Sequence, residues 1–531
     1  MIARGASLSI VILCAAAMTA ADDPTKPPAA PGASAKEAAP KRPAKPLFAE
    51  APTGDYSGPV KTIFTAANAP KTPALEELQL TDTVSQYGIT WKFDKKVRAG
   101  RFITGDWYFV GPATVVEITP KPLFGKEVAD SPHWKLVNDS GVKEGRYKDQ
   151  WARNGSVLNQ RVDTGRGGFD SRICHGHYDP NQFQKLPIGM KPGDSLISTI
   201  SAPEPIDHRG YGQPVLTAAV LTCMDKPVPA DAFRPSYCDR QNNIYLARNL
   251  KRELLYTLSR PSKAPVNLVQ WARVFERPWL DTVNWGYGNP KQNMPRYGRW
   301  MTCGVSHAAI LLHLDYPPED KEPLLVHYVQ YGIDLWGIVR AGFAGWSGHG
   351  GFGGGRKWSI IFAGLMLGDE DMRSPNVKYP KCLFGEDTQT AFGKSWTGAG
   401  VVFSSHPAWT KESPELKPPG EVIGTKAWGR WSSSEGYRRC CTSVEWPGEI
   451  LSAHLMRAQK LWNHDATFAY MDRWMTEDNV KWAIELRKVM VAKGMKAPWY
   501  EKATAPTDAL QLELWTKHRN SLPEPKQAGG K

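Results

Sequence analysis

The chain has 531 residues, enough for roughly two to four domains of ordinary size. Hydrophobic residues make up 41% of it and aromatic residues 11%, which excludes an intrinsically disordered protein. The formal net charge is +13, and residues 22–55 hold as many Lys and Arg as Asp and Glu, so the excess lies in the folded part. A basic surface attracts polyanions, either nucleic acid or an acidic polysaccharide.

The first 21 residues have the pattern of a secretory signal peptide. Arg4 supplies the positive charge, residues 8–18 are apolar, and Thr19-Ala20-Ala21 offers a cleavage site. The apolar stretch is too short to cross a membrane, and no later segment has the length of a transmembrane helix. We expect a secreted or periplasmic protein, and export argues against nucleic acid as its partner.

The rest of the chain divides by composition. Residues 22–55, rich in Pro, Ala and Lys, are predicted to be a disordered linker, and residues 521–531 a flexible tail. Residues 56–230 alternate as strands do, without helices between them, and predict an antiparallel β-sandwich. The predicted strands are 89–93, 107–110, 114–118, 195–201 and 215–222.

Helical spacing dominates after Pro235, so residues 236–520 are predicted to form an all-α (α/α) toroid-like domain, with a compact bundle as the alternative. Four leucines fall four apart from Leu246 to Leu258. Apolar faces also span 305–312, 325–339 and 451–462. Further predicted helices are 266–276, 357–367, 479–493 and 507–519.

Seven cysteines remain after removal of the signal peptide, so at least one thiol stays unpaired. Export permits disulfides. Cys440 and Cys441 are adjacent and predict either a vicinal disulfide or a bond from one of them to Cys382.

The most unusual segment runs from Gly345 to Trp358 and contains Gly-His349-Gly-Gly-Phe-Gly-Gly-Gly-Arg356-Lys357. A glycine-rich turn entering a helix exposes backbone N–H groups to an anion. The segment is either an anion site with a titratable histidine or a flexible interhelical loop.

Two more segments carry candidate site residues. Residues 432–442 place Tyr437 beside Arg438 and Arg439, either as a catalytic phenol or in a basic surface loop. Residues 284–300 combine Asn, Trp and Arg, which suit a cleft that binds sugars, and a helix follows. From this region we take Asn284, Arg299, Trp300 and His307, the last of which is either a core histidine or a catalytic one, and from the glycine-rich segment we take Trp346.

His175 and His177, two apart on a predicted strand, are candidates for a structural metal, although no third ligand is evident. No other cofactor is expected.

In layout and site composition, residues 56–520 resemble the α/α-toroid polysaccharide lyases, which are secreted bacterial enzymes that cleave uronic-acid polymers by β-elimination. The glycine-rich loop and the Tyr437-Arg-Arg-Cys-Cys-Thr442 loop are similar to segments of such proteins. The run His175-Gly-His177-Tyr-Asp179 resembles a His-rich strand of the heparinase-type β domain, although there the toroid precedes the sandwich.

The resemblance implies roles for the candidate residues. Tyr437 would be the acid and a candidate base, and His349 the base or the group that neutralises the substrate carboxylate. His307 would be a further catalytic candidate. Arg438 and Arg356 would hold the carboxylate. The sugar-binding residues would be Lys357, Asn284, Trp346, Trp300 and Arg299.

Two alternatives stay open. An α/α-barrel glycoside hydrolase would use two carboxylates across one bond, drawn from Asp281, Asp334, Glu386 and Glu435. A non-catalytic glycan-binding envelope protein would bind without turnover. The identity of the polysaccharide and the oligomeric state do not follow from the sequence.

Overall fold

The computed structural model describes residues 50–520, apart from 57, 59, 61, 136–147, 164, 174–176, 207–211, 262–265, 283–287, 296–298, 406–412, 478–487 and 495–505. The predicted signal peptide, most of the linker and the tail lie outside the described residues, as do Asn284 and His175. Contacts along the chain group residues 44–531 into one unit.

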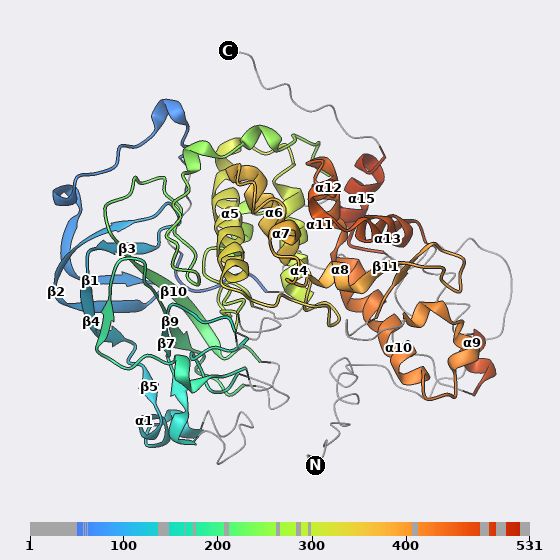
Figure 1. Cartoon of the computed structure of the whole chain (residues 1–531), viewed down its shortest axis with the longest axis horizontal. Helices are drawn as coiled ribbons and strands as arrows, with labels where there is room; N and C mark the ends of the chain where they lie inside the picture. Colours follow the sequence, from blue (N-terminus) through green and yellow to red (C-terminus); the bar gives the residue numbers. More distant parts are fainter. Residues whose placement is uncertain are drawn as a thin grey trace. The chain divides into compact units, whose positions relative to one another are not determined.

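One curled, eight-stranded sheet dominates the N-terminal part (Figure 1). Its strand order is β7-β9-β10-β3-β2-β4-β8, with β1 also paired to β2, and every pair is antiparallel except β10 with β3. The strands are β1 (Gln79–Gln86), β2 (Ile89–Arg101), β3 (Trp107–Val110), β4 (Ala113–Thr119), β7 (Ser156–Leu158), β8 (Ile188–Met190), β9 (Ser195–Ser201) and β10 (Val215–Met224).

The alternation of apolar and polar residues predicts where the strands lie. In β2, Ile89, Trp91 and Phe93 are buried and Lys92 is exposed, as the period of two requires. The predicted strands 107–110 and 195–201 coincide with β3 and β9, and the other three predictions lie within longer strands.

The predicted β-sandwich is not confirmed, because the sheet packs against helices. In β10, Ala218 and Val220 belong to the large core that contains the helices, whereas Ala219 and Leu221 belong to the core inside the curled sheet. The remaining described sheets are two-stranded: β5 (Leu123–Phe124) with β6 (Ala152–Arg153), and β11 (Thr390–Phe392) with β12 (Val401–Phe403). The structure is thus a mixed α and β fold.

The C-terminal part is mainly helical, and its helices pack in pairs: α5 on α3 and α6, and α11 on α4 and α15. Gly332 of α5 allows close approach, since an added Cβ would lie 2.5 Å from the Cβ of Ala363 in α6. A closed toroid is not confirmed. The principal helices are α3 (Leu268–Val274), α4 (Arg299–Leu311), α5 (Pro318–Arg340), α6 (Arg356–Leu367), α10 (Trp428–Tyr437), α11 (Pro447–Leu455), α13 (Asp465–Thr476) and α15 (Ala509–His518).

Two helix predictions need correction, and some helices were missed. The segment from Leu246 to Leu258 contains two short 3₁₀ turns (Ala247–Asn249 and Arg252–Leu254) in place of a helix, because the amides of Lys251 and Leu258 bond to the carbonyls of Met366 and His313. The predicted helix 451–462 is divided at Arg457, whose φ of 56° ends α11 before α12 (Gln459–Trp462) begins. Helix α13 was not predicted at all.

A buried ion cluster joins the sheet to the helices. Arg234 bonds to Asp106, beside β3, at 2.8 Å and to Asp334, in α5, at 2.6 Å. The predicted boundary at 230–236 therefore marks a change of secondary structure inside one unit. Among the described residues, no helix is both long and apolar enough to cross a membrane.

Candidate functional site

The structure brings three of the predicted segments into contact. The glycine-rich loop (345–355) lies between α5 and α6, and an added Cβ at Gly351 would lie 2.0 Å from the carbonyl oxygen of Cys441 and 2.5 Å from the Cβ of Arg299. Arg299 begins α4, and its Nη1 donates to the carbonyl oxygen of Cys440 at 2.5 Å. Only glycine fits at position 351, so the close packing of this loop explains its composition better than flexibility does.

The turn after α10 has π-helical hydrogen bonding from Arg438 to Thr442 and contains a disulfide between Cys440 and Cys441. This resolves the two pairings left open by the sequence, because Cys382 is free and buried. π-Helical turns occur often at functional sites.

Several polar side chains around this junction are half-buried and therefore accessible. Arg299 is 29% exposed and forms an ion pair with Glu445 at 2.9 Å. Tyr437 is the last residue of α10, directly before the turn that carries the disulfide, and is half-buried. His349 precedes Gly351 by two residues in the same loop. We call this the loop-junction site, and it consists of Arg299, His349, Tyr437, Cys440, Cys441 and Glu445.

Arg438 is fully buried and does not reach this surface, so its predicted role with a substrate carboxylate is not supported. It bonds to Glu435 at 3.1 Å, Glu477 at 3.2 Å and Glu415 at 3.5 Å. Burial opposes its charge, but attraction from Glu415 and Glu435 outweighs burial and raises the pKa of Arg438. These ion pairs of the Arg438 guanidinium stabilise the turn that follows Tyr437.

Arg356 and Trp346 are also buried, beneath the glycine-rich loop. Arg356 bonds to Asp281 at 3.1 Å and to the carbonyl oxygens of Phe352 and Gly354 at 2.6 and 2.7 Å. The Trp346 indole donates to the carbonyl oxygen of Asp281 at 3.0 Å. Both side chains stabilise the loop from its buried side, and neither is accessible to a sugar in this arrangement.

Lys357 is buried as well and forms an ion pair with Asp387, which also accepts from the Trp462 indole at 2.8 Å. Burial lowers the pKa of Lys357, and attraction from Asp387 opposes that shift. Like Arg356, it stabilises the start of α6 and is not a free cation at the surface.

His307 occupies the core. Its Nδ1 lies 2.8 Å from the carbonyl oxygen of Cys303, its Nε2 lies 3.0 Å from Asp508 Oδ2, and its ring stacks on Trp271 at 5.2 Å. Burial opposes the charged imidazole, but Asp508 outweighs it and raises the pKa of His307. Of the two alternatives for His307, the structure supports a core histidine, and its contact with Asp508 links α4 to α15.

The remaining predicted residues divide between core and undescribed regions. Trp300 is 8% exposed, so little of its ring is available for a sugar. His177 lies 3.2 Å through Nδ1 from the carbonyl oxygen of Gly165. No group of three metal-ligating side chains occurs among the described residues, which exclude His175, so the predicted metal stays untested.

Sequence reasoning named Glu386 but missed Glu449, the second carboxyl group of a buried pair under the same loop. The Gly355 amide donates to Glu386 at 2.5 Å. Burial and then repulsion from Glu386 raise the pKa of Glu449. Glu449 lies on the otherwise apolar helix α11, and that contrast was the available signal.

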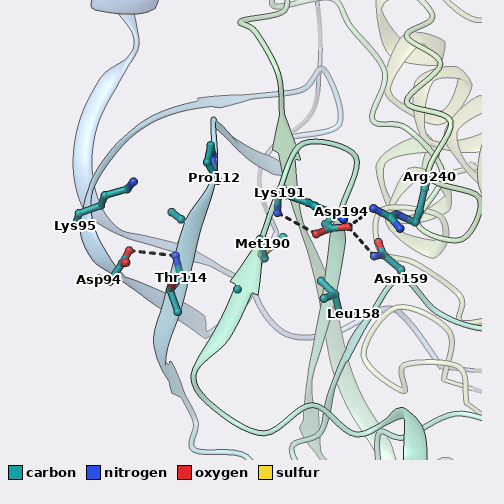
Figure 2. A pocket seen from close by; sticks show the side chains of 12 residues that line it. Asp94, Lys95, Pro112, Thr114, Leu158, Asn159, Met190, Lys191, Asp194 and Arg240 are labelled. Atoms are coloured by element: carbon teal, nitrogen blue, oxygen red, sulfur yellow. Dashed lines mark hydrogen bonds and ion pairs between the residues drawn. The ribbon is translucent and has the colours of Figure 1, made fainter.

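A separate open pocket of about 670 Å³ lies beside the sheet, lined by residues of β2, β4 and β8 and by Arg240 (Figure 2). Asp194 accepts there from Asn159 at 2.7 Å, Arg240 at 3.0 Å and the Lys191 amide at 2.9 Å. Lys95 and Lys191 are exposed at its rim. The pocket contains none of the predicted site residues.

Comparison of the chain with models of protein families, with curated proteins and with solved structures finds no match.

Proposed function

We propose that the protein is an exported lyase that cleaves an acidic polysaccharide by β-elimination at the loop-junction site. The observation that carries this proposal is the contact of Gly351 with Cys441 and Arg299, which brings the segments of His349, Tyr437 and Arg299 together, and each of these three side chains is partly exposed. Arg299 takes the role that the sequence assigned to Arg438 and Arg356.

The reaction needs three groups. A base removes the proton at C5 of a uronate, an acid protonates the leaving glycosidic oxygen, and a cation stabilises the charge that develops on the carboxylate. Tyr437 and His349 are the proton-transfer candidates. The contacts of Arg299 to described residues use Nη1, which leaves Nε and Nη2 for side-on, bidentate binding of a carboxylate.

The hydrolase alternative has weaker support. A glycoside hydrolase needs two carboxyl groups that flank an accessible bond. The four carboxylates considered for that role are at most 3% exposed, and each bonds to a buried arginine or a backbone amide. They are Asp281, Asp334, Glu386 and Glu435.

A second candidate is glycan binding without turnover, which the open pocket beside the sheet favours. Lys95, Lys191 and Arg240 place positive charge around it, as an acidic polymer would require. The lyase proposal also includes secretion, directed by residues 1–21. It further includes a toroid-like arrangement of the helices, with which the pairing of α5 with α6 and of α4 with α11 is consistent.

The test is product analysis on a panel of uronic-acid polymers. β-Elimination leaves an unsaturated sugar that absorbs ultraviolet light, whereas hydrolysis releases reducing ends without that absorbance. We expect both signals to rise together. Reducing ends without the absorbance would identify a hydrolase, and binding with neither signal would identify a glycan-binding protein.

A further inference from the structure

We propose that the Cys440–Cys441 disulfide is a redox-active site, which a dithiol reductant opens, and that its opening loosens the glycine-rich loop. The inference concerns the conformation of the loop-junction site and does not require the lyase reaction.

Accessibility distinguishes this disulfide from the other sulfur groups. Cys440 and Cys441 are half-buried, whereas the free cysteines among the described residues are buried. Burial raises the pKa of Cys223 and Cys382 to about 12 and that of Cys303 to about 11, so these thiols are poor nucleophiles at neutral pH. An external thiolate reacts with a disulfide and not with a free thiol, so the reductant attacks the half-buried Cys440–Cys441 bond, and the buried free thiols resist the alkylation that follows.

A disulfide between neighbouring residues contributes little to global stability. In the chain-entropy account, a disulfide stabilises by restricting the unfolded chain, and the effect grows with the length of the loop that it closes. This bond closes only an eight-membered ring. The turn is held independently, because Arg438 bonds to Glu435 and Glu477, and Ser443 bonds to Tyr470 at 2.7 Å. The bond can thus open while the protein stays folded.

The ring is coupled directly to the loop-junction site. The carbonyl carbon of Cys440 is a member of the eight-membered ring, and its oxygen accepts from Arg299 at 2.5 Å. The carbonyl oxygen of Cys441 lies against Gly351, where no Cβ could fit. Opening the ring frees rotation about the bonds that orient both carbonyls, so the Arg299 contact and the packing of Gly351 weaken together.

The chemistry is a balanced thiol–disulfide exchange. A thiolate of the reductant attacks one sulfur, the S–S bond breaks, and a mixed disulfide forms while the other cysteine leaves as a thiolate. The second thiol of the reductant then displaces the attached cysteine. The protein gains two electrons and two protons, and the reductant becomes a cyclic disulfide.

The experiment titrates the folded full chain with dithiothreitol, alkylates the exposed thiols, and maps them by mass spectrometry. Hydrogen exchange of residues 345–355 is measured in parallel on oxidised and reduced protein. We expect Cys440 and Cys441 to be alkylated before any other cysteine, and exchange in the loop to accelerate at least about tenfold, as local opening predicts. Reoxidation should restore slow exchange.

The matched control is the double variant Cys440→Ser, Cys441→Ser, which should exchange rapidly in the loop with or without reductant. Reversible reduction of the natural chain keeps the test valid even if that variant folds poorly. A disulfide that is reduced only together with exposure of the buried cysteines would overturn the proposal. So would unchanged exchange at 345–355 in the reduced protein. Neither readout depends on activity, so failure here is distinct from failure of the lyase assignment.

Discussion

The loop-junction site and the pocket beside the sheet use positive charge in opposite ways. At the junction, Arg438 and Arg356 are buried, paired with carboxylates, and serve to fix the backbone beneath one accessible cation, Arg299. At the pocket, Lys95 and Lys191 remain exposed to solvent. Buried charge of the first kind preorganises a site, whereas exposed charge of the second kind attracts a polyanion with little geometric selection.

Replacing one arginine in each region should give the largest contrast. Arg438→Met leaves Glu435, Glu415 and Glu477 without their central partner, so we expect a loss of about 3–5 kcal/mol in the free energy of unfolding. Arg240→Met removes an ion pair in which the arginine is 45% exposed, and Asp194 keeps its bonds to Asn159 and the Lys191 amide, so the loss should be less than about 1 kcal/mol. Denaturant unfolding measures both, and equal losses would contradict the distinction.

Acid should destabilise the junction selectively. Burial opposes the charge of Glu477, but attraction from Arg438 and Arg473 lowers its pKa to about 2. A carboxylate with a lowered pKa stabilises the fold above its unfolded pKa of about 4.3, and this stabilisation is lost as the pH falls toward the folded value.

We therefore expect Glu477→Gln to destabilise the protein by about 2–3 kcal/mol at about pH 5 and to have little effect near the folded pKa. Unfolding free energies of the natural chain and the variant across this range measure the difference. A constant difference would show that Glu477 does not titrate in this way.

Adding one methyl group should reduce stability in the tightly packed glycine-rich loop but not in the open pocket. Gly351→Ala puts a Cβ against Cys441 and Arg299 and should cost about 1–3 kcal/mol, with loss of activity. Gly189→Ala, in the pocket, meets no atom within 4 Å and should be close to neutral. Thermal unfolding of the two variants tests this, and a neutral Gly351→Ala would remove the observation on which the site depends.

The smallest effect on stability should come from the pocket lysines. Lys95→Ala with Lys191→Ala should change the free energy of unfolding by less than about 0.5 kcal/mol. It should weaken binding of a uronic-acid polymer at low salt, and the difference should disappear at high salt because exposed charges are screened. Calorimetry at two salt concentrations would show this, and unchanged binding at low salt would exclude the pocket as a docking surface.

The sequence predicted local structure well where one physical factor dominates. Alternation placed β3 and β9 correctly, and the helical spacing of α4, α5, α6 and α15 was also recognised. It failed where tertiary contacts decide: in the segment 246–258 the amides of Lys251 and Leu258 bond to Met366 and His313, and the Ser- and Gly-rich helix α10 is held by the burial of Trp431.

For the site, the three unusual segments named from the sequence lie in contact, but the sequence did not predict how deeply their side chains are buried. Composition marks Arg438, Arg356 and Lys357 as cations and cannot show that carboxylates distant in sequence neutralise each of them. Those partners, Glu415, Asp281 and Asp387, come together only through packing of the helices.

The most direct test of the central claim compares Tyr437→Phe with Tyr379→Phe, a half-buried tyrosine outside the loop-junction site. The measurement is the ultraviolet absorbance of the unsaturated product from a uronic-acid polymer. We predict a loss of about 10²–10⁴-fold in rate for Tyr437→Phe and an unchanged rate for Tyr379→Phe, because only the first removes a proton-transfer group. A Tyr437→Phe variant that forms the unsaturated product at the natural rate would contradict the assignment of the reaction to this site.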